Sequence, residues 1–143
     1  MSAPFEGFSG AKIALIEGTR VLTYLRDDKP SIPFPGCWDF AGGGQENGET
    51  PEQCALRETQ EEFALDIDAS RIVWREKCQA FTDPTKHSYF LVAHITPAEI
   101  ATICFGDEGQ YWQMMEIEAF LSHPGAIPQL QERLARLLPS QNC

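Results

Sequence analysis

The segment from Gly43 to Leu65 constrains this chain more than any other part of its sequence. It opens in a run of three glycines, and then Thr50, Pro51 and Gln53 supply the cap, the first-turn proline and the capping-box partner of an α-helix. From Pro51 onward the residues are mostly good helix formers, without an internal glycine or proline. The sequence therefore predicts a helix that follows a glycine loop whose backbone can approach a ligand closely.

Three carboxylates crowd one side of this predicted helix. Glu58 and Glu62 lie one turn apart, and Glu61 is next to them. Like charges at this spacing destabilise a helix by roughly 0.2–0.5 kcal/mol per pair, a cost that bound Mg²⁺ would offset because it prefers carboxylate oxygens. Arg57 stands four residues before Glu61 and eight after Glu49, where it can orient the carboxylates. A solvated acidic helix face is the alternative interpretation.

The spacing of these residues resembles the signature box of the Nudix hydrolases. The matching pattern is Gly43-x5-Glu49-x7-Arg57-Glu58-x-x-Glu61-Glu62-x-x-Leu65. Two positions depart from the family pattern, because Thr59 stands where an apolar residue is usual and Ala64 replaces a late glycine. Ala64 puts the usual helix-ending geometry in doubt, since a glycine there tolerates positive φ. The segment from Trp38 to Ala41 is also similar to the run that precedes the box in MutT-like members, with Ala41 in place of a proline.

The resemblance implies a site for Mg²⁺ or Mn²⁺. The implied metal-binding groups are Glu58, Glu61, Glu62, the backbone carbonyl of Gly43, and Glu108. Glu108 stands in an E-G-Q loop similar to one that reaches back to the metal site in MutT-like proteins, either as a ligand or as the base, and Asp107 is the neighbour that would substitute for it. A surface turn is the alternative for this loop. Glu49 and Arg57 are expected to hold the loop and the helix together.

The activity that the resemblance implies is hydrolysis of a diphosphate linkage in a nucleoside diphosphate joined to a group X. Metal ions shield the anionic diphosphate and lower the pKa of the attacking water, whose proton passes to Glu58 or Glu108. A nucleoside triphosphate that yields a monophosphate and pyrophosphate is the first expectation for the substrate. A nucleotide sugar such as ADP-ribose is the alternative.

Two further readings do not involve catalysis. A Nudix-fold nucleotide-binding module that has lost activity would usually have lost box glutamates, whereas all three are present here. Carboxylates that hold Ca²⁺ only to stabilise the fold are disfavoured, because the dense Asp/Asn-Gly spacing of a calcium loop is absent from the sequence.

The length and charge of the chain limit its partners. Its 143 residues suit one domain, residues 1–143, and a net charge of −10 argues against a nucleic-acid polymer as partner. The sequence has neither a signal peptide nor an apolar run long enough to span a membrane. Five scattered cysteines fit reduced thiols, so we expect a cytoplasmic protein. The resemblance also makes a homodimer possible, as dimers are common in the family.

Strand and helix signals alternate along the rest of the chain. The predicted strands are residues 11–16 and 21–25 as a hairpin, 38–41, 71–81, 88–95 and 110–115. The predicted helices after the box are a short turn from 96, residues 117–122, and an amphipathic helix that Pro128 opens. This mixture predicts an α/β protein, an α/β/α sandwich around a mixed β-sheet, which is also the Nudix fold that the resemblance implies.

Overall fold

The structure is a computed structural model, and it describes residues 8–80, 83 and 85–141. The end of the predicted strand at Phe81 and both chain ends lie outside the described residues. The strands are β1 (Phe8–Glu17), β2 (Arg20–Leu25), β3 (Trp38–Asp39), β4 (Ala41–Gly44), β5 (Ile72–Gln79), β6 (His87–His94) and β7 (Tyr111–Glu116). The helices are α1 (Pro51–Phe63), the 3₁₀ turn η1 (Ala69–Arg71), α2 (Pro97–Ile100), α3 (Ile117–Ser122) and α4 (Pro128–Gln141).

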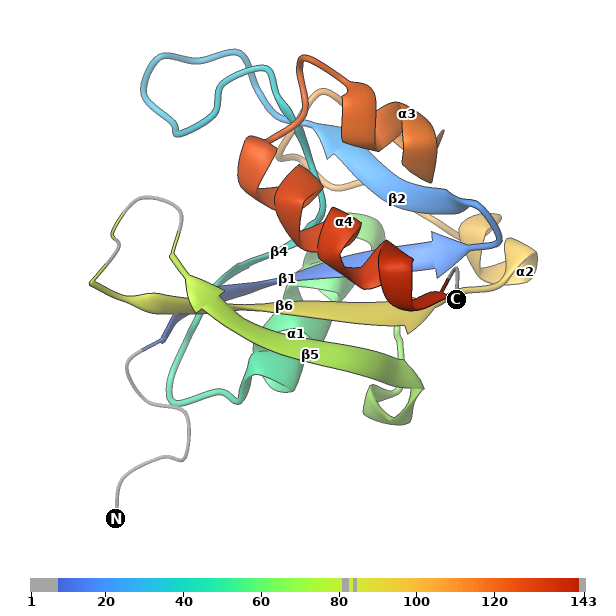
Figure 1. Cartoon of the computed structure of the whole chain (residues 1–143), viewed down its shortest axis with the longest axis horizontal. Helices are drawn as coiled ribbons and strands as arrows, with labels where there is room; N and C mark the ends of the chain where they lie inside the picture. The colour runs from blue at the N-terminus through green and yellow to red at the C-terminus, as the bar shows by residue number, and fades with distance from the viewer. Residues whose placement is uncertain (1–7, 81–82, 84, 142–143) are drawn as a thin grey trace.

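A mixed sheet organises the molecule, with strand order β3-β2-β1-β6-β5. β1 pairs with β6 in parallel, and its pairings with β2 and β4 are antiparallel. β4 and β7 lie off this path, since β4 pairs with β1 and β7 pairs with β2. β1 therefore pairs with β2, β4 and β6, which places it at the centre of the fold (Figure 1).

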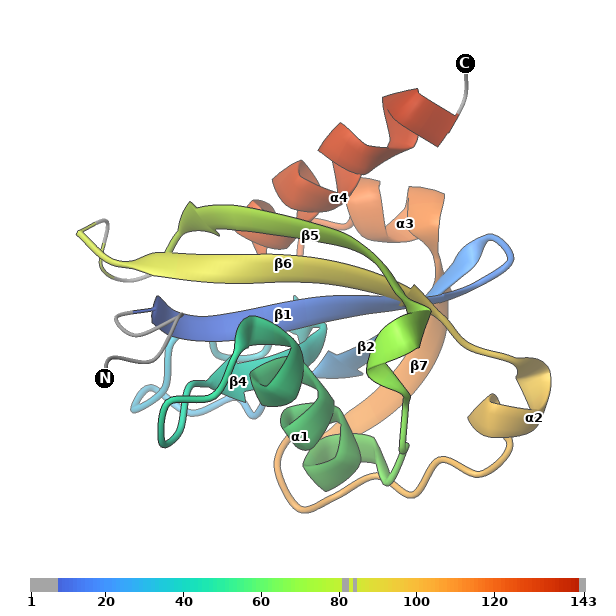
Figure 2. The same cartoon turned by 90° about the horizontal axis from the view of Figure 1, so that it is seen from below.

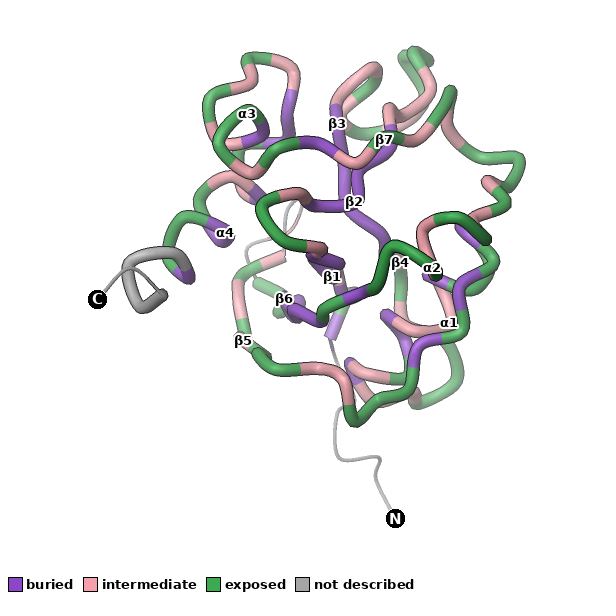
Figure 3. The backbone as a smooth tube through the Cα atoms, turned by 90° about the vertical axis from the view of Figure 1, so that its right-hand side faces the viewer, coloured by how far each residue is buried: buried purple, intermediate pink, exposed green. Residues whose placement is uncertain are grey.

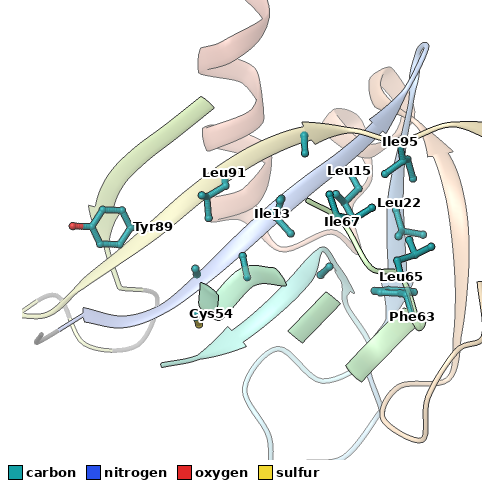
Figure 4. Close-up of a cluster of buried hydrophobic side chains, with 14 of the residues drawn as sticks. Ile13, Leu15, Leu22, Cys54, Phe63, Leu65, Ile67, Tyr89, Leu91 and Ile95 are labelled. Atoms are coloured by element: carbon teal, nitrogen blue, oxygen red, sulfur yellow. The ribbon is translucent and has the colours of Figure 1, made fainter. Parts of the chain in front are cut away.

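Two hydrophobic cores fill the two sides of the sheet. Successive β1 side chains point to opposite faces, so Ile13 and Leu15 join the core beneath α1 while Ala14 and Ile16 join the core beneath α3 and α4. Figure 2 shows α1 on one side of the sheet and α3 and α4 on the other, and Figure 4 shows the core that α1 covers. The buried residues accordingly concentrate along the central strands (Figure 3). The predicted α/β/α sandwich around a mixed sheet is confirmed.

The glycine run is a strand rather than the loop that the sequence predicts. Gly42, Gly43 and Gly44 pair with Lys12, Ala11 and Gly10 of β1 in antiparallel register. A side chain at Gly10 would collide with the carbonyl group of Gly43, and one at Gly42 with the carbonyl group of Ala11, so Gly10 and Gly42 allow the strands to approach. The glycines thus fix β4 against the centre of the sheet, immediately before α1.

The remaining elements follow the sequence patterns closely. The predicted hairpin, the short helical turn after Thr96 and the amphipathic C-terminal helix are all present. Leu130, Leu134 and Leu137 of α4 are buried in the second core, as their spacing predicts. Among the described residues, the structure has no helix that is both long enough and apolar enough to cross a membrane.

Candidate active site

The helix α1 begins and ends at defined residues, and this fixes the direction of its glutamates. Thr50 caps the helix, because its hydroxyl accepts a hydrogen bond from the Gln53 backbone while the Gln53 side chain accepts one from the Thr50 N–H. Ala64 ends the helix in the left-handed region, with φ of 57°. The glycine-like geometry is therefore kept by an alanine. Thr59 is fully buried and its hydroxyl donates to the Ala55 carbonyl at 2.8 Å, which explains how a polar residue occupies an apolar position.

Glu58 lies directly against the glycine strand. A Cβ added at Gly43 would stand 2.5 Å from Cδ of Glu58, so only a glycine leaves room for this carboxylate. The Gly43 carbonyl accepts a weak hydrogen bond from Sγ of Cys54 at 3.4 Å, which ties β4 to the first turn of α1. Burial raises the pKa of Glu58, against the lowering effect of Arg57. The Glu58 carboxylate is thus packed against the backbone of Gly43.

Glu62 is the most buried of the three helix glutamates. Its Oε1 accepts a hydrogen bond of 3.0 Å from the backbone N–H of Gly42. Burial raises the pKa of Glu62 to about 8, although the nearby Lys12 ammonium and this hydrogen bond lower it. A carboxylate whose ionisation is disfavoured by burial suits a site that a cation enters.

Arg57 joins the carboxylates to the segment before the helix. Its Nε and Nη2 donate to Glu49 at 2.7 and 3.1 Å, and Nη2 also donates to the Gly44 carbonyl at 2.8 Å. Its Nη1 lies 3.3 Å from Glu58 and 3.2 Å from Glu61, whose side chain is 54% exposed. The Arg57 guanidinium holds the pKa of Glu49 below its usual range. Arg57 therefore both fixes the loop and faces two of the glutamates.

The loop that carries Glu108 packs against the C-terminal end of α1. The Gly106 N–H donates to the Glu62 carbonyl at 2.9 Å, and the Cys104 N–H donates to the Phe63 carbonyl at 3.1 Å. Figure 2 shows this segment, between α2 and β7, passing beside the end of α1. A recess of about 220 Å³ results, and it is lined by Glu58, Glu61, Glu62, Gly106, Asp107 and Glu108.

The donor set of this recess fits a hard divalent cation, because five carboxylate side chains line it. In the part of the chain that the structure describes, no three His, Cys, Asp or Glu side chains already converge as a ligand set. Glu58 and Glu61 instead face the guanidinium of Arg57. Binding of a cation would therefore involve small rotations of these side chains, while the contact of Arg57 with Glu49 keeps the helix and loop in place.

A second group of charged residues lies beside the recess, and the sequence patterns did not single it out. Asp39 is completely buried, and its Oδ2 accepts hydrogen bonds from Lys12 and Arg26, each at 2.9 Å. The Tyr24 hydroxyl donates to the same oxygen at 3.1 Å. Burial is the main reason that the pKa of Tyr24 lies far above its usual range, so the hydroxyl keeps its proton. Asp39 follows a tryptophan in a motif-like run, which was the one signal available in the sequence.

Lys12, Arg26 and Asp39 line a cavity of about 250 Å³ on the α4 side of the sheet. Its walls include the cations Lys12, Arg26 and Arg133, the carboxylate of Asp39, the ring of Phe34, and Gly43. Arg133 is 5% exposed and donates to the Gln79 carbonyl at 2.6 Å, which fixes its guanidinium at the wall. The cavity is thus cationic although the chain is strongly acidic, and Gly43 of its wall packs against Glu58 of the recess.

A mixed sheet between two helical layers, with a glutamate-bearing helix after a glycine strand, defines a known class of α/β protein. A sequence model of the NUDIX domain matches residues 10–140, and the chain therefore belongs to the Nudix family. The resemblance inferred from the box is confirmed.

Individual relatives are similar over parts of their length. The chain is 42% identical over 60 residues to an 8-oxo-dGTP diphosphatase of Proteus vulgaris, which covers 40% of this chain and 51% of that protein. It is 36% identical over 81 residues to an RNA pyrophosphohydrolase of Blochmanniella pennsylvanica, covering 57% of this chain and 46% of that protein. The chain thus spans about half the length of these curated relatives.

A solved structure is similar over nearly the whole chain. It is a bifunctional NMN adenylyltransferase/ADP ribose pyrophosphatase from Francisella tularensis, complexed with AMP and a Mn ion. The TM-score is 0.75 at 17% identity, and the match covers 96% of this chain and 43% of that chain. This likeness supports the fold.

Proposed function

We propose that this protein is a metal-dependent pyrophosphohydrolase that cleaves the diphosphate linkage of a nucleoside diphosphate joined to a group X. The observation that carries the proposal is a recess of carboxylates close to a cationic cavity, with Glu58 of the recess packed against Gly43 of the cavity wall. The two parts of this site suit the two parts of a nucleotide. A diphosphate needs cations, and a nucleoside needs an enclosing pocket. The assignment of residues 1–143 as one domain is part of this proposal.

The residues divide between metal binding and positioning. The proposed ligands of Mg²⁺ or Mn²⁺ are Glu58, Glu61, Glu62, Glu108 and the Gly43 carbonyl. A divalent cation in this recess would shield the diphosphate and lower the pKa of the attacking water. Glu49 and Arg57 hold the strand-to-helix connection rigid, which keeps the recess open to substrate.

The proposed hydrolysis is a substitution at phosphorus. The oxygen of water forms a bond to one phosphorus of the linkage, the P–O bond to the other phosphoryl group breaks, and that group leaves with the electron pair. The water proton passes to the carboxylate of Glu58 or of Glu108. The raised pKa of Glu58 favours it as proton acceptor, because a carboxylate whose pKa is raised by burial holds a proton more strongly.

We propose a nucleoside triphosphate as the substrate, which would yield a monophosphate and pyrophosphate. The name of the Proteus vulgaris relative supports a nucleoside triphosphate. The Francisella tularensis structure, whose title includes ADP ribose pyrophosphatase, favours ADP-ribose as the second candidate. A cytoplasmic location and a homodimer stay predictions from the sequence.

A substrate panel tests this proposal. It contains the nucleoside triphosphates, ADP-ribose, other nucleotide sugars and dinucleoside polyphosphates, each assayed for phosphate and pyrophosphate release with Mg²⁺ or with EDTA. Metal-dependent turnover of one class would support the proposal and identify X. Nucleotide binding without turnover of any compound would favour a silent binding module instead.

A further inference from the structure

Lys12 lines the cationic cavity, and a single glycine of β4 separates it from Glu62 of the recess. It sits on β1 opposite Gly42 of β4, and it lines the cavity together with Gly43. The Gly42 carbonyl is 3.4 Å from Nζ of Lys12, while the N–H of the same residue donates to Glu62. One glycine therefore separates the ammonium group from the most buried glutamate of the recess.

Asp39 holds this ammonium group in place. Lys12 and Arg26 both donate to Oδ2 of Asp39, and the N–H of Phe40 donates to Oδ1 at 2.7 Å. Because the carboxylate is fully buried and accepts several hydrogen bonds, its position is strongly determined. Lys12 is consequently a fixed charge and not a freely moving surface lysine.

The Lys12–Asp39–Arg26 cluster carries more positive than negative charge, since two cations share one carboxylate. The strong hydrogen bond of Lys12 is the one to Asp39 at 2.9 Å. Its contacts with the Phe40 and Gly42 carbonyls, both 3.4 Å, are long for N–H···O hydrogen bonds. A phosphoryl oxygen can replace these two contacts at little cost. The Lys12 side chain is 16% exposed, so a ligand in the cavity can reach it.

We propose that Lys12 binds a phosphoryl oxygen of the substrate's diphosphate, as a fixed protein cation beside the metal-binding glutamates. The inference rests on the proposed function and deepens it. A diphosphate that extends from the cavity toward Glu62 passes Gly42, whose carbonyl lies beside the Lys12 ammonium. Lys12 thereby adds a phosphate contact that does not depend on a metal ion.

A purely structural role for Lys12 is the competing explanation, in which the ammonium only balances the buried charge of Asp39. A double variant distinguishes the structural role of Lys12 from the phosphate-binding role. Lys12→Met alone leaves Asp39 with less compensation, and this destabilises the fold in either case. Lys12→Met combined with Asp39→Asn removes both charges, so a structural role predicts recovery of both stability and ligand affinity. A phosphate-binding role predicts recovery of stability alone.

The experiment measures binding of inorganic pyrophosphate in the presence of Mg²⁺ by calorimetry, together with thermal unfolding. We expect Lys12→Met, and the double variant with Asp39→Asn, to bind pyrophosphate about ten- to a hundredfold more weakly than the unchanged protein. Lys77→Met is the matched control, because Lys77 is exposed on β5, and it should bind pyrophosphate normally. We expect Lys12→Arg, which keeps the charge, to retain more affinity than Lys12→Met.

Unchanged pyrophosphate affinity in the folded double variant would overturn the role of Lys12. If Lys12→Met does not fold, the double variant still decides the matter, because its position 39 carries no charge that needs Lys12. Failure of the proposed function looks different: the unchanged protein would then hydrolyse no compound of the substrate panel. An unchanged protein that hydrolyses a nucleotide, with a double variant of equal affinity, would contradict only the inference about Lys12.

Discussion

The backbone N–H of Gly42 donates a hydrogen bond of 3.0 Å to Oε1 of Glu62, which joins the glycine strand to the last turn of α1. The bond keeps a buried carboxylate aimed at the strand and not at solvent. Burial is nevertheless the larger influence on this group, and it raises the pKa of Glu62 to about 8. The protein therefore maintains a carboxylate that is costly to ionise in the absence of a cation.

This cost predicts a specific dependence of stability on pH. In EDTA, the unfolded chain releases the Glu62 proton near its ordinary pKa of 4.5, whereas the folded chain keeps it up to about pH 8. The unfolded state thus binds fewer protons in this window, so the free energy of unfolding falls as pH rises, by up to about 1.4 kcal/mol per pH unit. Glu62→Gln removes this contribution, and we expect the variant to be more stable than the unchanged protein at pH 8 in EDTA.

Urea denaturation at pH 6 and pH 8 in EDTA measures this effect. We expect a smaller loss of stability between the two pH values for Glu62→Gln, and Mn²⁺ titration should show that the variant binds metal more weakly. Glu52→Gln, in the first turn of α1 and paired with Arg75 on the partly exposed surface, is the control. The same pH dependence in Glu62→Gln and in the unchanged protein would show that Glu62 is not the group responsible.

Gly43→Ala should abolish activity while largely preserving the fold. The added Cβ would lie 2.5 Å from Cδ of Glu58, so the flexible Glu58 side chain must move away from the Gly43 carbonyl. We expect turnover to fall at least about a hundredfold, because a displacement of about 1 Å at a reacting group can cost this much. Gly44→Ala is the matched control, since its Cβ would meet nothing closer than the Ser9 carbonyl oxygen at 3.7 Å. Equal loss of turnover in both variants would contradict the role of the Glu58 position.

Arg57→Lys tests the contacts by which Arg57 clamps the loop before α1 to the helix, namely those with Glu49 and with the Gly44 carbonyl. Lysine keeps the charge, but it lacks the planar fork that lets Arg57 contact Glu49 and the Gly44 carbonyl together. We expect a loss of about 1–2 kcal/mol in stability and a fall in kcat of about tenfold or more, measured by denaturation and steady-state kinetics. Arg20→Lys, in a more exposed pair with Glu17, should change neither quantity much. Full kcat in Arg57→Lys would show that the clamp is not needed for catalysis.

Ala64→Gly should stabilise the protein. Ala64 has φ of 57°, a left-handed conformation that costs an alanine roughly 1 kcal/mol and a glycine almost nothing. Because glycine also gives the unfolded chain more freedom, we expect a net gain of about 0.5 kcal/mol in the free energy of unfolding. Ala55→Gly, inside α1 and fully buried, should instead be destabilising. A destabilised Ala64→Gly variant would mean that the helix ends differently in solution.

Much of the fold follows from local patterns in the sequence. The capping box at Thr50, the hairpin between β1 and β2, and the leucine stripe of α4 each depend on residues close together in the chain, and each has the predicted structure. The placement of Glu108 depended on a resemblance, since periodicity does not show that its loop returns to the end of α1. The backbone hydrogen bond between Gly106 and Glu62 is a contact between distant residues.

Other features could not be predicted for the same reason. The glycine run forms a strand because Gly10 of β1 provides the space opposite it, and a pattern within the run does not reveal that partner. Lys12 stands within a mostly apolar strand. The position of its ammonium group depends on the hydrogen bond to Asp39, which lies 27 residues later in the chain. The sequence around Arg133 indicates only a helix residue. Its contacts with Gln79 of β5 and Ser88 of β6 depend on how α4 packs against the sheet. Pairings of this kind are set by tertiary packing.

The most direct test of the account is a Mg²⁺ titration of diphosphate hydrolysis in the unchanged protein and in Glu61→Gln and Glu62→Gln. The assay uses the compound of the substrate panel that is hydrolysed fastest, and circular dichroism checks that each variant is folded. We predict turnover that rises with Mg²⁺ and disappears in EDTA for the unchanged protein, with most turnover lost in both variants. Retained turnover in both folded variants, or equal turnover with and without metal, would contradict the assignment of this recess as a metal-dependent active site.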